Sequence, residues 1–248
     1  MATAVLSPAR SGNARPGVVY PHAQWYFLLA IVITWVGFAR SYFAVIRSEP
    51  LLHHIHGALM GGWIALLIVQ PILYQRGKLK LHRTLGRWGA FVLIPAMVVV
   101  GFLMVRRMFT HPGSLPPFIV DHLAFLDLNA LFDIPFFVAM AIYTGRDVHR
   151  HARWITCTVM TMVPPALVRA MPMLPMFRHN FALNVNLGMG MICVVFLLLM
   201  VDDWRKAGKV FSPYPVAFAL TALAGVGANY AAGWDWWHAL TVLLGRAG

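Results

Sequence analysis

The chain has 248 residues, of which 60% are apolar and only 11% charged, whereas soluble domains carry roughly 25% charged residues. A soluble globule of this length cannot bury so many apolar side chains, and an intrinsically disordered chain contains few of them. The composition excludes both classes and indicates a membrane protein that crosses the bilayer several times.

Apolar segments of suitable length follow one another along the chain. A membrane-spanning helix needs about 20 apolar residues, and residues 1–22 contain no such segment, so we expect a polar tail there and no cleavable signal peptide. Residues 23–232 predict an all-α bundle of about seven membrane-spanning helices. Residues 233–248 are too short to span but carry three tryptophans, which predicts an interfacial helix. The predicted spans are 23–46, 52–74, 85–108, 118–143, 154–171, 181–201 and 214–232.

The basic residues of the loops predict the orientation of the bundle. The N-terminal tail and the loops after the second, fourth and sixth spans hold 13 of the 20 Lys and Arg residues. Short loops rich in Lys and Arg stay in the cytoplasm, so we expect a cytoplasmic N-terminus in a bacterial inner membrane. Topology therefore accounts for the formal net charge of +12, and we expect no nucleic-acid partner.

The histidines sort by membrane side. His54 and His56 begin the second predicted span and His122 begins the fourth, on the outer side. His82 begins the third span and His151 the fifth, on the cytoplasmic side. Bis-histidine haem needs such an arrangement, because its iron takes two axial imidazoles from facing helices. The alternative is that each histidine is an interfacial anchor or a helix-end partner.

Glycines follow two of these histidines at helical spacing. His82, Gly86 and Gly89 are spaced i, i+4 and i+7 and so share one helix face. We expect this face to be a smooth strip against which a flat porphyrin lies. A similar strip begins at His54 on the second span.

Other polar residues predict a polar bundle interior, because a polar side chain inside a bilayer is costly. His122, Asn129 and Asp133 share a face of the fourth span, with Asp133 near mid-membrane. His56 and Gln70 share a face of the second span.

Arg169 in the fifth span needs a compensating charge, which Asp127 or Asp121 can supply. Such an ion pair would fix helix packing, and a substrate or proton path is the alternative interpretation.

A methionine-rich segment lies in the outer loop after the fifth span. Met171, Met173 and Met176 precede His179, and thioethers are soft ligands that favour Cu(I). The alternative is that these methionines only contact lipid.

Two resemblances to known families follow from these residues. The segments around His54-Ile-His-Gly57, Leu81-His82-Arg83-Thr-Leu-Gly86 and His151-Ala-Arg153 resemble an uncharacterised family of bacterial integral membrane proteins, over roughly residues 25–215. That family implies no activity but adds weight to these residues.

The arrangement of spans is also similar to that of the six-helix, ascorbate-reducible di-haem cytochromes b, in which helices 2 and 4 hold one haem and helices 3 and 5 the other. This resemblance implies an outer haem between His54 or His56 and His122, and an inner haem between His82 and His151.

These observations lead to one main hypothesis and two alternatives. The main hypothesis is a b-type cytochrome-like protein that uses haem b to pass electrons across the inner membrane, with a quinol or another redox partner as donor. Arg40, Arg83 and Arg153 are candidate partners for the haem propionates. The first alternative is a metal-binding or transport protein that collects copper at its outer face. The second is a structural or assembly subunit.

Overall fold

The computed structural model describes residues 20–113 and 115–246, and every regular element within them is helical. Six continuous helical segments are long and apolar enough to cross a bilayer, and α1 is a shorter apolar helix. The predicted all-α membrane bundle is therefore confirmed. The helices are α1 (Ala23–Phe38), α2 (Leu51–Gln75), α3 (Leu79–Trp88), α4 (Ile94–Thr110), α5 (Pro117–Tyr143), α6 (Val148–Met162), α7 (Pro164–Ala170), α8 (Phe181–Ala207), α9 (Pro213–Tyr230) and α10 (Asp235–Leu243).

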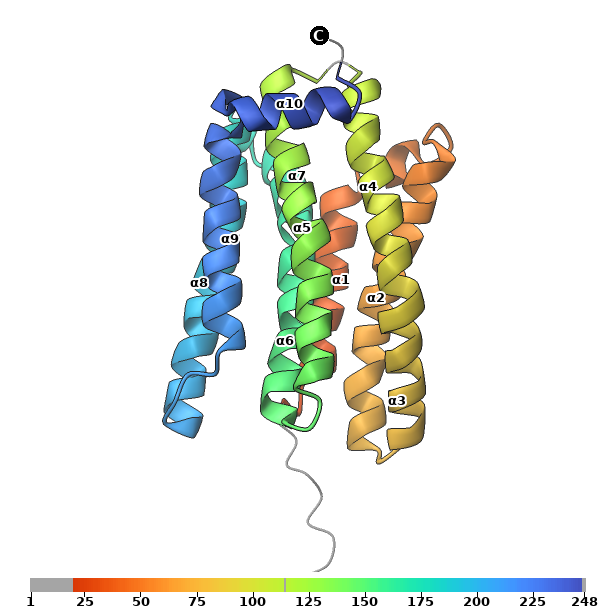
Figure 1. Cartoon of the computed structure of the whole chain (residues 1–248), viewed down its shortest axis with the longest axis vertical. Coiled ribbons are helices and arrows are strands. Elements are labelled where there is room, and N and C mark those ends of the chain that lie inside the picture. The colour runs from red at the N-terminus through yellow and green to blue at the C-terminus, as the bar shows by residue number, and fades with distance from the viewer. Residues whose placement is uncertain (1–19, 114, 247–248) are drawn as a thin grey trace, which may run out of the picture.

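Successive helices run up and down the bundle (Figure 1). The turns 76–78, 144–147 and 208–212 lie together at the lower end in that view, which we call the basic end because Lys and Arg residues surround these turns. Helix α10 lies across the opposite end, which we call the α10 end. The predicted grouping of the basic loops on one side is therefore confirmed. Most of the predicted N-terminal tail, residues 1–19, lies outside the described residues.

Helix α1 is shorter than predicted, because it ends at Phe38 whereas the predicted span continues to residue 46. The chain then turns through a short 3₁₀ helix, Phe43–Val45, before α2 begins. Near its end α1 crosses α7 closely at Gly37, where a Cβ atom would lie 2.2 Å from the carbonyl oxygen of Ala166. Only glycine permits this contact, which holds α1 against the bundle.

Two of the spanning segments contain local irregularities. A π-helical turn, Gly89–Leu93, joins α3 to α4 into one continuous segment. Helices α6 and α7 form another, with a bend at Val163 before Pro164 and Pro165. Proline lacks the backbone N–H that a helix interior requires, which accounts for the bend at this point.

The main core lies between the helices toward the basic end and is built from aromatic and aliphatic side chains. Trp63, Phe137 and Trp154 are among its buried members. Trp63 donates a hydrogen bond from Nε1 to Oγ1 of Thr158, at 3.0 Å, and so ties α2 to α6. Large apolar side chains such as Phe132 remain exposed on the outside of the bundle, as expected for contact with lipid.

Helix α10 packs across the bundle through its tryptophans. Trp237 is 1% exposed, contacts the rings of Phe109 and Phe125, and donates a hydrogen bond to the Asp121 carboxylate at 2.8 Å. Arg246 also pairs with Asp121. Asp121 therefore anchors α10 and is not the partner of Arg169.

Candidate functional site

Two of the predicted haem ligands meet at the basic end. His82 is the fourth residue of α3 and His151 the fourth residue of α6, so both rings lie one turn inside the bundle. Their ring centroids are 6.3 Å apart, with an angle of 67° between the planes. With metal–nitrogen bonds of about 2 Å on each side, this separation suits one metal atom between two imidazoles.

Both imidazoles are oriented by backbone carbonyl groups. Nδ1 of His151 lies 2.8 Å from the carbonyl oxygen of Ala141 in α5, and Nδ1 of His82 lies 3.4 Å from that of Gln70 in α2. A carbonyl oxygen only accepts hydrogen bonds, so each Nδ1 carries the proton and each Nε2 presents a lone pair. This orientation is typical of metal-bound histidine.

The surroundings of His82 contain polar atoms that the protein itself does not satisfy. The Tyr74 ring lies 5.9 Å from the His82 ring, and Gln70 donates from Nε2 to the carbonyl oxygen of His82. Among the described residues, the Tyr74 hydroxyl and Gln70 Oε1 are buried without hydrogen-bond partners. Buried polar groups normally have partners, so these atoms indicate a polar ligand or water near His82.

The glycine face of α3 packs against α2. A Cβ atom at Gly89 would lie 2.4 Å from a methyl group of Leu66, and one at Gly86 would lie 3.5 Å from the amide nitrogen of Gln70. These glycines let α3 approach α2, so the strip expected to contact a porphyrin is covered by α2 side chains. Arg83, on the same helix, is exposed.

Arg153 is fully engaged within the protein. Its Nε lies 2.9 Å from both carboxylate oxygens of Asp203, and its Nη1 donates to the His149 carbonyl oxygen at 2.8 Å. The guanidinium also lies over the Phe211 ring, 4.0 Å from the centroid. Arg153 thus ties α6 to α8, where the sequence predicted a propionate partner. The sequence placed Asp203 at the cytoplasmic end of its span with Arg205 and Lys206 as the expected partners, and the structure pairs it with Arg153.

Of the predicted outer histidines, His54 and His122 contact different residues. His122 donates from Nδ1 to the Phe118 carbonyl oxygen at 2.8 Å and packs against the Phe181 ring of α8. His54 is hydrogen-bonded through Nδ1 to the Tyr42 hydroxyl at 2.6 Å. The two histidines therefore have different neighbours, although Nε2 of His122 is buried without a partner among the described residues.

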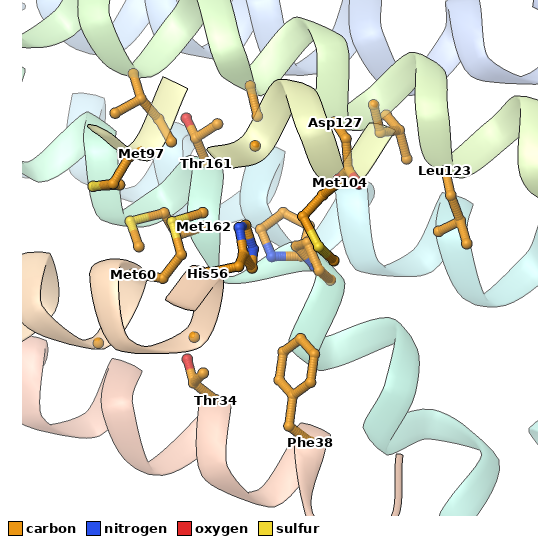
Figure 2. Close-up of a pocket in the computed structure, with 18 of the residues that line it drawn as sticks. Thr34, Phe38, His56, Met60, Met97, Met104, Leu123, Asp127, Thr161 and Met162 are labelled. Carbon is orange, nitrogen blue, oxygen red and sulfur yellow. The ribbon is translucent and has the colours of Figure 1, made fainter. Parts of the chain in front are cut away.

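A large cavity occupies the half of the bundle nearer the α10 end. Its volume is about 660 Å³, and residues of α1, α2, α4, α5 and α7 line most of it. Figure 2 shows His56 of α2 and Asp127 of α5 directed into this space, with Met60, Met104 and Met162 around them. Neither the cavity nor its methionines were predicted, but the cavity is lined by Asn129, Asp133 and Asp127, which the sequence had placed in a polar bundle interior.

The polar residues of the cavity fall into two groups. Asn129 donates to the Phe125 carbonyl oxygen on its own helix, at 2.7 Å. His56, Asp127 and Asp133 form no hydrogen bond or ion pair within the described part of the chain. The expected pair between Arg169 and Asp127 is also absent among those residues, and Arg169 instead donates to the carbonyl oxygen of Pro165 at 3.0 Å.

The methionine-rich segment forms two short 3₁₀ turns at the α10 end. Met171 and Met173 are half-buried, whereas Met176 is 77% exposed and His179 is exposed. Within residues 20–113 and 115–246, no group of three or more His, Cys, Asp or Glu side chains could hold a metal ion. A copper site formed by the methionines stays a prediction.

Comparisons with known proteins add no functional information. A scan against models of protein families, a search of curated proteins and a search of solved structures each gave no match. The resemblance to an uncharacterised bacterial membrane family therefore stays a prediction.

Proposed function

We propose that the protein is an electron-transfer protein of the bacterial inner membrane that binds one haem b near the cytoplasmic end of the bundle. In this proposal His82 and His151 would hold the haem iron. The observation that carries it is the proximity of two imidazoles, with 6.3 Å between the ring centroids, each held through Nδ1 by a backbone carbonyl that leaves Nε2 unused by this contact. When bound, the haem supplies one-electron redox chemistry.

The number of ligands supports haem over a simple metal ion. Two protein ligands suffice for haem iron, because the macrocycle supplies the other four, whereas structural zinc takes four protein ligands. The exposed Arg83 lies on the same helix as His82 and suits a propionate near the membrane surface. The proposal keeps one of the two predicted haems, because His122 and His54 have different neighbours.

A visible spectrum tests this proposal. We expect the protein purified from bacterial membranes to show a sharp α-band in a reduced-minus-oxidised spectrum. His82→Ala and His151→Ala should each abolish the band, because each removes an axial ligand. His122→Ala is the matched control and should retain it, because that ring packs against Phe181.

Colourless wild-type protein that elutes as a folded species would reject the proposal, as would an α-band retained in His82→Ala. Colourless protein that binds Cu(I), and loses it when Met171, Met173 and Met176 are replaced, would favour the copper alternative.

A further inference from the structure

The cavity near the α10 end has the size and position of a ligand site within the membrane. Its volume of about 660 Å³ lies in the range of small-molecule pockets, roughly 300–1,000 Å³. Its walls are segments of spanning helices, including Met60 of α2, Met104 of α4 and Leu123 of α5 (Figure 2). A molecule that enters between these helices comes most directly from the bilayer.

Besides Asp133, three polar side chains in this cavity have unused hydrogen-bonding capacity within the described part of the chain. Among the described residues His56 and Asp127 have no partner, and Arg169 uses only Nη1, toward the Pro165 carbonyl oxygen. The Arg169 guanidinium otherwise lies over the Phe38 ring, 4.7 Å from the centroid. Ionisable groups inside a membrane are costly unless they are partnered, and they therefore mark functional sites.

The signs of these charges indicate the chemistry of the ligand head. Arg169 would attract an anionic head group, but Asp127 and Asp133 would repel it. A cationic head group would be attracted by the two carboxylates and repelled by Arg169. A neutral head with oxygen acceptors and hydroxyl donors matches all of them, because Arg169 and His56 can donate while Asp127 accepts.

The apolar walls favour a flat aromatic ring. On α2 a Cβ atom at Gly61 would have no neighbour within 4 Å, and one at Gly57 would have only Tyr42 at 3.9 Å, so this helix face is smooth and open. Thioethers such as those of Met60 and Met162 are adaptable and make favourable contacts with aromatic rings.

We propose that this cavity binds a membrane-soluble quinone or quinol, with its ring against the Gly57–Gly61 face of α2 and its oxygens toward His56, Asp127 and Arg169. A quinone bound here would be the membrane-soluble redox partner of the proposed electron-transfer protein. This role as redox partner rests on the haem proposal. The binding itself depends only on the cavity.

Photolabelling with an azido-quinone probe, mapped by peptide mass spectrometry, tests this site in the full chain in lipid nanodiscs. We expect labelled peptides from α2 and α5, and displacement of the probe by decylubiquinone. Gly61→Leu fills the cavity and should weaken displacement by decylubiquinone about tenfold or more, whereas Asp127→Asn should weaken it about three- to tenfold.

Gly190→Leu is the matched control. Gly190 also lies in a spanning helix, α8, and its Cβ would have no neighbour within 4 Å, but it does not line the cavity. We expect wild-type binding for this variant.

Three results would overturn the quinone site. These are labelling that decylubiquinone does not displace, unchanged affinity in folded Gly61→Leu protein, and displacement by oleate or phosphatidylglycerol but not by decylubiquinone. The haem spectrum of the same sample separates the two proposals. Lost quinone binding with the α-band retained defeats this site alone, and retained binding without haem defeats the proposed function alone.

Discussion

The cluster around Arg153 at the basic end and the cavity nearer the α10 end treat their polar side chains differently. Toward the basic end, Arg153 is paired with Asp203, and the hydroxyls of Tyr20 and Tyr214 are 2.7 Å apart. In the cavity nearer the α10 end, His56 and Asp127 have no such partners among the described residues. Partnered polar groups fix helix packing, whereas unpartnered groups within a membrane leave capacity for a ligand.

Mutagenesis can test this difference, because it predicts different changes in the free energy of unfolding for the two regions. Replacing a partnered charge should destabilise the protein, because the other charge is left buried alone. Replacing an unpartnered charge should cost little or increase stability, because an uncompensated charge is removed from an apolar environment.

The largest effect on stability is expected from replacing Asp203, which is 1% exposed and pairs with Arg153. Asp203→Ala should lower the free energy of unfolding by about 3–5 kcal/mol, because it leaves the guanidinium buried without its carboxylate. Reversible unfolding in mixed micelles, followed by circular dichroism, measures this change.

The adjacent residue supplies a matched control. Asp202 pairs with Lys206 at the surface, where both side chains are substantially exposed, so Asp202→Ala should cost only about 0–1 kcal/mol. Equal losses of unfolding free energy in Asp202→Ala and Asp203→Ala would mean that the buried pair of Arg153 and Asp203 does not stabilise the basic end.

The sequence predicted the helices better than their contacts. Apolar length fixes which segments can span a bilayer, so six segments and the position of α10 agreed with prediction. The end of α1 was misplaced, because composition does not show where a chain turns back to meet its neighbour. The contact of Gly37 with Ala166 has no local sequence signal either, because it joins helices distant in the chain.

The candidate sites show the same limit. His82 and His151 were predicted as a pair, and the structure brings them together. His122 and Asp133 were predicted on one face of α5, yet His122 packs against Phe181 while Asp133 lines the cavity. Helical periodicity tells which residues share a face, but one face of a long helix meets different neighbours at different depths.

A smaller effect, of opposite sign, is expected in the cavity at Asp133. Because this carboxylate has no partner among the described residues, Asp133→Asn should leave stability unchanged or raise it by up to about 1 kcal/mol. Asp203→Asn, the same chemical change at a partnered site, should instead lower the free energy of unfolding, because it removes the charge that compensates Arg153. The same unfolding assay compares them, and a large loss at Asp133 would remove the distinction between the two regions.

The smallest effect on stability near neutral pH is expected at Tyr20. This residue precedes α1, and its hydroxyl is hydrogen-bonded to Tyr214 of α9. Burial raises the pKa of the Tyr20 hydroxyl to about 12, although its hydrogen bond with Tyr214 and the nearby Arg153 charge oppose this shift. The folded protein therefore holds this proton more tightly than the unfolded chain does, whose tyrosine pKa is about 10. The resulting stabilisation is complete below pH 10 and is lost as the pH rises toward 12.

The variant Tyr20→Phe isolates this contribution. It removes the titrating hydroxyl but keeps the ring, which the Arg153 guanidinium approaches to 5.3 Å. Lysines and the other tyrosines titrate in both proteins, so the difference between their melting temperatures from pH 9 to 12 reports Tyr20. We expect the wild-type melting temperature to fall more steeply over this range. Parallel curves would show that the hydroxyl is as accessible to solvent in the folded protein as in the unfolded chain, and that pairing at the basic end does not extend to Tyr20.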